Sequence, residues 1–161
     1  MSLTIPSVVI RGNDQGELNI RRWLKRYFSR PVTRRMQMQV VLLIAGFGAL
    51  GCVTRYFVSG WVYDLFGKTL PYGTFVVNII GAFIIGLIME FSLRSTLLSG
   101  NMRAGLTIGF LGGLTTFSTF SYETFRLLEG GEFFIAMVNV LMSVMVCLTF
   151  TWLGIHAARY L

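Results

Sequence analysis

The sequence predicts an all-α membrane protein with four transmembrane helices, of which the third is broken at mid-membrane. Hydrophobic residues make up 54% of the 161 residues, and the mean hydropathy of +0.67 is too high for an ordinary soluble enzyme. Four runs of 19 to 23 residues contain no charged side chain, and each is long enough to cross a bilayer core of roughly 30 Å. These runs cover residues 36–54, 69–89, 104–122 and 133–155.

Positive charge is concentrated in residues 1–35, which hold eight arginines and lysines against two acidic residues. No zinc-finger, RNA-recognition or helix-turn-helix pattern accompanies this charge, so we expect no nucleic-acid partner. We expect a basic N-terminal tail, cytoplasmic or disordered, that meets the headgroups of the membrane lipid. Within it, residues 20–28 are expected to form a short amphipathic turn at the membrane surface. Residues 36–161 then form one four-helix transmembrane domain.

The first run combines small residues with a charge near its end. Gly46, Gly48 and Gly51 have a spacing that lets one membrane helix approach another closely. The same letters match a dinucleotide-binding fingerprint, but that motif needs a strand and a βαβ unit, which a membrane span excludes. We expect the Arg55 guanidinium either to reach the membrane surface or to pair with a partner's polar group, because charge in the bilayer core is costly.

The second run contains one strongly polar side chain, that of Asn78. Two interpretations are open. The amide either forms a hydrogen bond to a neighbouring helix, worth about 1 kcal/mol, or offers its two N–H groups to an anion. Gly81 and Gly86 in the same run are expected to be packing contacts.

The third run carries the most unusual residues for a membrane segment, GFLGGLTTFSTF over residues 109–120. Adjacent glycines cost about 1 kcal/mol each in a helix interior, and unwound backbone is tolerated in a membrane only where protein or water covers it. We therefore expect a broken helix whose freed carbonyls and hydroxyls handle an ion. A helix that resumes after the glycines places Phe117 and Phe120 on one face. Rings in a membrane helix usually only pack, but the hydroxyls interleaved with these two favour contact of their positive edges with an anion.

The fourth run places Asn139, Ser143 and Cys147 on one helix face, with Thr151 one turn further on. Such a polar stripe is expected to face protein or a water-filled path. Cys147, like Cys52 in the first run, is expected to behave as a small apolar residue without a metal or disulfide role. His156 is expected to lie at the membrane surface.

The segments GTFVVNIIGAFIIG (residues 73–86) and GFLGGLTTFSTFSYE (residues 109–123) resemble the paired signature of the small fluoride channels, the Fluc family, also called CrcB. The resemblance covers roughly residues 38–160. It implies a passive fluoride-selective channel in the cell (inner) membrane that exports cytoplasmic fluoride and lowers its toxicity, with 36–161 as the channel domain. It also implies an antiparallel, dual-topology homodimer with a structural Na⁺ at the dimer interface.

The resemblance also implies roles for individual residues. The two phenylalanines would turn their ring edges toward fluoride, and Glu123 would lie near a pore mouth. Gly112 and Thr115 would hold the Na⁺ through backbone carbonyls from each subunit. The implied fluoride pore comprises Asn78, Phe117, Phe120, Thr116, Ser143 and Glu123. The roles of Asn139, Cys147 and His156 stay open.

The basic tail departs from what dual topology requires. From Met36 onward the arginines and lysines are balanced three to three between the two sides, but the tail changes this to eleven against three. The protein therefore starts at Met36 or Met38, tolerates the tail in both orientations, or pairs with an oppositely oriented paralogue.

Two other classes of function compete with a channel. A proton-coupled multidrug exporter also has four spans, but it needs a membrane-embedded carboxylate and the first run has none. A non-transporting membrane scaffold would not need a broken polar helix. An enzyme is not expected, because no acid–base pair, activated nucleophile or ligand cluster is present.

Overall fold

The computed structural model describes residues 22, 34–67, 70–95 and 97–160. The chain divides into two compact units, residues 1–34 and residues 35–161. The basic tail and the amphipathic turn predicted for residues 20–28 lie outside the described residues, apart from Arg22 and Arg34. The second unit contains every predicted site residue and is described below.

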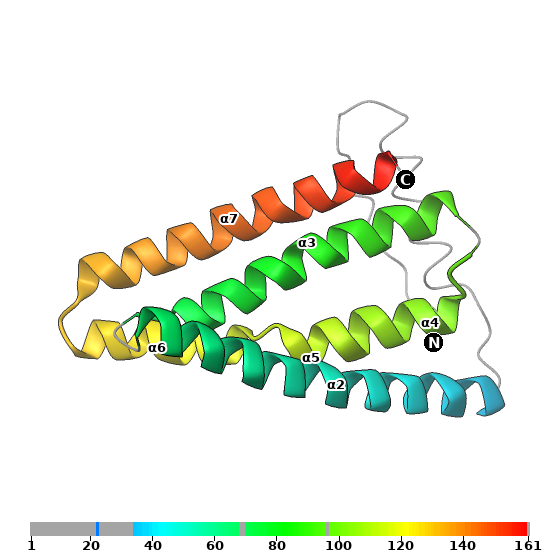
Figure 1. Ribbon diagram of the computed structural model, residues 1–161, viewed down its shortest axis with the longest axis horizontal. Helices are drawn as coiled ribbons and strands as arrows, with labels where there is room; N and C mark the ends of the chain where they lie inside the picture. The colour runs from blue at the N-terminus through cyan, green and yellow to red at the C-terminus, as the bar shows by residue number, and fades with distance from the viewer. Residues whose placement is uncertain (1–21, 23–33, 68–69, 96, 161) are drawn as a thin grey trace, which may run out of the picture. The chain divides into compact units, whose positions relative to one another are not determined.

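The described residues form helices and no strands (Figure 1). Three long helices are α2 (Arg34–Phe66), α3 (Tyr72–Arg94) and α7 (Phe133–Arg159). Each has the length and apolar composition needed to cross a membrane, α2 from Met38 onward. Between α3 and α7 lies a divided segment, residues 100–129. It consists of α4 (Gly100–Ala104), a π-helix η1 (Gly105–Leu111), α5 (Gly112–Leu114) and α6 (Phe117–Glu129). The predicted all-α class, with a broken third helix, is confirmed.

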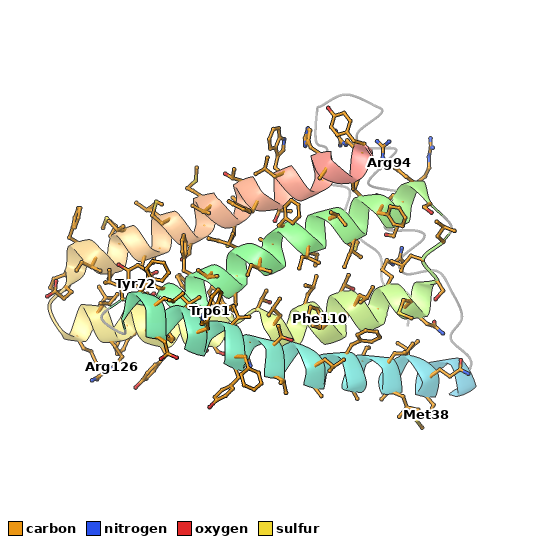
Figure 2. The ribbon with its side chains drawn as sticks, viewed as in Figure 1. Met38, Trp61, Tyr72, Arg94, Phe110 and Arg126 are labelled. Carbon is orange, nitrogen blue, oxygen red and sulfur yellow. The ribbon has the colours of Figure 1, made fainter. Side chains whose placement is uncertain are left out.

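The four segments of this unit run alternately in opposite directions (Figure 1). The start of α2, marked by Met38, and the end of α3, marked by Arg94, lie at one end of the bundle (Figure 2). Tyr72 at the start of α3 and Arg126 on α6 lie at the other end. This arrangement is the one expected of four successive membrane crossings joined by short connections.

Helices α3 and α7 lie side by side because two glycines let their backbones approach. A Cβ on Gly86 would strike the carbonyl oxygen of Thr151, and a Cβ on Gly154 would strike that of Phe83. The expected packing role of Gly86 is therefore confirmed. At the ends of both helices the Glu90 carboxylate accepts hydrogen bonds from two arginines, Arg94 at 2.8 Å and Arg159 at 3.2 Å.

Helix α2 packs against the divided segment in the same way. A Cβ on Gly51 would strike the carbonyl oxygen of Phe110, and one on Gly113 would lie 2.5 Å from that of Gly48. The predicted close approach is thus confirmed for Gly48 and Gly51. Gly46 takes no part in it, because a Cβ there would meet nothing within 4 Å.

The outward faces of the long helices remain apolar and exposed. Only 6%, 17% and 11% of the residues in the most apolar windows of α2, α3 and α7 are buried within the chain. Contiguous apolar surface of this extent is found where a protein meets lipid or another subunit. The fold therefore suits a membrane, with further surface available for a second protein copy.

We expect Gly154→Ala to destabilise the protein by about 1–3 kcal/mol, the usual cost of overpacking. The added methyl group has to displace the α3 backbone rather than a flexible side chain. Gly100→Ala is the matched control, since its methyl group enters open space. Thermal unfolding of the detergent-purified variants measures the difference, and equal midpoints for both variants would contradict the packing described for α3 and α7.

Candidate functional site

The divided segment loses its helical geometry at Thr115 and Thr116. Both residues have extended backbone, with φ and ψ of −83° and 157° at Thr115 and −150° and 116° at Thr116. The sequence suggested unwinding at the adjacent glycines, and this is wrong, because Gly112 and Gly113 are helical. Gly113 serves close packing against α2 instead, as the contact with Gly48 shows. The break follows two residues later.

The Asn78 side chain forms hydrogen bonds with the backbone of Thr116 at the break. Its Oδ1 accepts a hydrogen bond from the Thr116 N–H at 2.8 Å, and its Nδ2 donates to the Thr116 carbonyl at 3.2 Å. The reverse orientation of the amide would place donor against donor and acceptor against acceptor. Of the two interpretations of Asn78, the hydrogen bond to a neighbouring helix is therefore confirmed. One amide N–H remains for another acceptor.

This arrangement frees backbone carbonyls of the divided segment. In a continuous α-helix the Thr116 N–H would donate to the Gly112 carbonyl and the Thr119 N–H to the Thr115 carbonyl. Here the first donates to Asn78, and the second donates to the Thr116 hydroxyl at 3.2 Å. The Gly112 and Thr115 carbonyls are thus among those that lose their helical donors at the break.

Arg55 lies beside one of these freed carbonyls. Its Nη1 donates to the carbonyl oxygen of Thr115 at 3.2 Å. Arg55 thus pairs with a polar group, but with one of its own chain rather than the partner's group expected from the sequence. On the other side of the break, the Thr115 methyl group occupies the position that a Cβ on Gly81 would take. The expected packing role of Gly81 is confirmed.

A cluster of hydroxyls forms at the start of α6. The Thr116 hydroxyl caps this helix and lies 3.2 Å from the Ser118 hydroxyl and 2.9 Å from that of Thr119. Thr116 is buried, whereas Ser118 and Thr119 are exposed. Hydroxyls donate or accept as needed, so this cluster is able to offer O–H groups to an anion.

Phe117 and Phe120 share a face of α6, as predicted. Their ring centroids are 5.5 Å apart with the planes tilted by 42°. Phe117 is 78% exposed, so one face of this pair is open to contact with lipid or with another protein. The structure brings the pair next to the hydroxyl cluster, since both belong to the first turn of α6.

The polar stripe of α7 faces protein, as predicted. Ser143 is buried, and Asn139, Cys147 and Thr151 are half-buried, whereas most of the side chains around them are exposed. The Asn139 amide donates to the Thr124 hydroxyl at 2.8 Å. Asn139 therefore links α7 to α6, a role that the sequence left open. His156 lies in the last turn of α7 and contacts the Trp152 carbonyl, with ring centroids of the two residues 4.0 Å apart.

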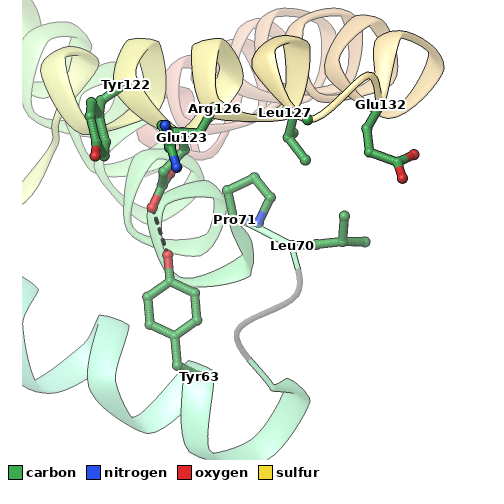
Figure 3. Close-up of a pocket in the computed structure, with 9 residues that line it drawn as sticks. Tyr63, Leu70, Pro71, Tyr122, Glu123, Arg126, Leu127 and Glu132 are labelled. Carbon is green, nitrogen blue, oxygen red and sulfur yellow. Dashed lines mark hydrogen bonds between the residues drawn. The ribbon is translucent and has the colours of Figure 1, made fainter.

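Glu123 has a partner that the sequence did not suggest. The Tyr63 hydroxyl on α2 donates to its Oε1 at 2.9 Å (Figure 3). Helical spacing was the available signal, because Arg55, Ser59 and Tyr63 recur every four residues along α2. The other carboxylate oxygen, Oε2, is buried and has no hydrogen-bond partner within the described residues.

Two cavities meet at this pair of residues. The inner cavity, of about 520 Å³, extends from Tyr63 and Glu123 past Arg55 to Thr116 and Thr119. The outer cavity, of about 610 Å³, lies beside the connections between helices. Figure 3 shows its wall: Glu123 and Arg126 extend from α6 toward Tyr63, with Pro71 beside them.

Comparison with known proteins identifies the family of the chain. The family described as "CrcB-like protein, Camphor Resistance (CrcB)" matches residues 42–155. A protein of Geotalea daltonii named "Fluoride-specific ion channel FluC" is 76% identical over 124 residues, which are 77% of this chain and all of that protein. Proteins of the same name from Geobacter sulfurreducens and Pelobacter propionicus are 65% and 61% identical over 124 residues, covering 100% and 96% of their lengths. The chain belongs to the CrcB family.

Proposed function

We propose that the protein is a passive fluoride-selective ion channel that lets cytoplasmic fluoride leave the cell through the inner membrane. The observation that carries the proposal is the break at Thr115–Thr116, held by Asn78 and followed at once by hydroxyls and paired rings. The names of the relatives, fluoride-specific ion channels at 61–76% identity, support the same function.

The chemistry of the site suits a small, strongly hydrated anion. A channel has to replace the water around its ion with groups fixed at close range. The remaining Asn78 N–H and the Ser143 hydroxyl are donors. The Thr116 hydroxyl donates to that of Thr119, which can offer its own O–H in turn. The positive edges of Phe117 and Phe120 add weaker attraction. Apolar surroundings strengthen each of these contacts, because the local dielectric constant is low.

The two rival functions have less support. A proton-coupled exporter needs a carboxylate free to exchange protons with a substrate path. Glu90 pairs with two arginines at the helix ends, and Glu123 accepts a hydrogen bond from Tyr63. A scaffold function would not require a polar break between Leu114 and Phe117.

The channel is proposed to be an antiparallel homodimer, or a pair with an oppositely oriented paralogue. Support comes from surfaces that the single chain leaves open. Phe117 is largely exposed, and a Cβ on Gly112 would meet nothing within 4 Å. A second copy seated here would cover the ring pair and the freed carbonyl together.

The Gly112 and Thr115 carbonyls are proposed to contribute to a structural Na⁺ site shared by the two copies. They fit this role because the break removes their helical donors, and backbone carbonyl oxygens replace the hydration shell of alkali cations. The Arg55 contact with the Thr115 carbonyl does not exclude it, since a carbonyl oxygen has two lone pairs. When bound, Na⁺ would supply positive charge and a link between subunits.

Fluoride efflux from liposomes that contain only the purified protein tests the function, with chloride efflux as the control. We expect fluoride to leave and chloride to stay.

Phe117→Ile and Phe120→Ile keep the apolar volume but remove the positive ring edge, so each should lower fluoride efflux at least about tenfold with the dimer intact. Leu128→Ile, on the same helix but away from the break, should conduct normally. Normal efflux from both phenylalanine variants would make the rings packing residues only.

The Na⁺ proposal predicts a cation-dependent stability. Replacing Na⁺ with N-methylglucamine should lower the thermal midpoint, because a ligand at about 100 times its dissociation constant adds roughly 2.7 kcal/mol of stability. The measurement is thermal unfolding of the detergent-purified protein in matched chloride salts. Identical midpoints in the two salts would contradict a structural Na⁺ site.

Dual topology and the basic tail make a separate prediction. Eleven basic residues against three should insert full-length chains with the N-terminus inside, whereas a chain beginning at Met36 should insert both ways. A single reporter, Thr69→Cys in a Cys52→Ala and Cys147→Ala background, can be labelled from each side of the membrane. One-sided labelling of the long form and two-sided labelling of the short form are expected. Two-sided labelling of the long form would contradict the orientation bias.

A further inference from the structure

Tyr63 and Glu123 are the two residues that line both cavities. The inner cavity continues from them to Arg55 and the break, and the outer cavity continues to Pro71 and Arg126. Their hydrogen bond of 2.9 Å, from the Tyr63 hydroxyl to Glu123 Oε1, therefore marks the boundary between the two linings. Figure 3 shows this hydrogen bond in the wall of the outer cavity. The pair therefore belongs to the walls of both cavities.

The position of the Tyr63 ring is set by the start of α3. A Cβ on Gly73 would lie 2.6 Å and 2.8 Å from two ring atoms of Tyr63, and Gly73 is buried. The absence of a side chain at residue 73 thus makes room for the ring to cross from α2 toward α6. Helices α2, α3 and α6 together fix where the hydroxyl meets Glu123.

Opposite charges face the inner cavity without pairing. Arg55 and Glu123 both line it. Arg55 donates to the Thr115 carbonyl, and within the described residues no carboxylate forms an ion pair with it. Glu123 keeps a buried Oε2 without a hydrogen-bond partner in the same part of the chain. Turning this carboxylate toward the Arg55 guanidinium would lower its electrostatic energy, so another contact has to keep it in its position.

We propose that Tyr63 is a positioning residue of the ion path, an inference that rests on the proposed channel function. Its hydroxyl holds Glu123 at the boundary between the cavities and away from Arg55. The guanidinium charge then stays available to attract an anion into the inner cavity. Without the hydroxyl, Glu123 turns inward, neutralises Arg55 and adds a negative charge that repels fluoride.

Tyr63→Phe tests this directly, because it removes the hydroxyl and keeps the ring against Gly73. We expect the half-saturating fluoride concentration for liposome efflux to rise about tenfold, since losing one hydrogen bond to a charged group has an effect of this order. Tyr72→Phe is the matched control. That ring lies at the same end of the bundle beside Phe66, outside both cavities, and the variant should behave as wild type.

A change in half-saturating concentration distinguishes positioning from folding. A variant that merely folds poorly would lower the maximal efflux and leave the half-saturating concentration unchanged, and this result would overturn the inference. Glu123→Gln removes the charge that would turn toward Arg55 once the Tyr63 hydroxyl is lost. Adding Tyr63→Phe to it should therefore change the half-saturating concentration by less than about twofold. If the effects of the two substitutions on the half-saturating concentration multiply instead, the inference is also overturned. A wild-type protein that does not conduct fluoride would overturn the proposed function, and this inference with it.

Discussion

The paired hydrogen bonds between the Asn78 amide and the Thr116 backbone are the interaction on which the rest of the site depends. An unsatisfied backbone group in the bilayer core costs several kcal/mol, so a helix cannot simply stop inside a membrane. Asn78 supplies one acceptor and one donor to the residue where the helix stops. The Thr116 hydroxyl then caps the helix that follows. Two side chains thereby replace part of the hydrogen bonding that the helix loses.

The consequences of this interaction extend in both directions along the chain. Before the break, the Gly112 and Thr115 carbonyls no longer receive helical hydrogen bonds, which makes them available to a cation or to Arg55. After it, α6 begins with its hydroxyls and paired rings already gathered in one turn. The proposed cation and anion contacts would therefore both arise from one feature of the backbone. The close approach of α3 that permits it depends on Gly81, which leaves room for the Thr115 side chain.

The sequence predicted much of the fold because membrane helices have a strong and simple signature. Uncharged runs located the four segments, and four-residue spacing correctly placed Asn139, Ser143 and Cys147 on a protein-facing stripe. The shared face of Phe117 and Phe120 followed from the same helical geometry. Resemblance of two motifs to the fluoride channels identified the family, which the comparisons confirm.

What the sequence could not predict were contacts between segments far apart in the chain. The adjacent glycines suggested the place of the break, yet Gly113 serves packing and the break lies at Thr115–Thr116. The position of the break is decided by a hydrogen-bond partner on α3, Asn78. This residue is 38 residues away from Thr116 in the sequence. The hydrogen bond from Tyr63 to Glu123 spans 60 residues and has no local signal apart from the spacing along α2.

An experimental structure of the Asn78→Ala variant in lipid tests the central claim most directly. Without the amide, the Thr116 N–H and carbonyl have no side-chain partner on α3. The account predicts that the Thr116 N–H returns to the Gly112 carbonyl and that the helix runs through residues 115–116, moving the start of α6 away from α3. A break that stays at Thr115–Thr116, with α6 unmoved, would contradict it.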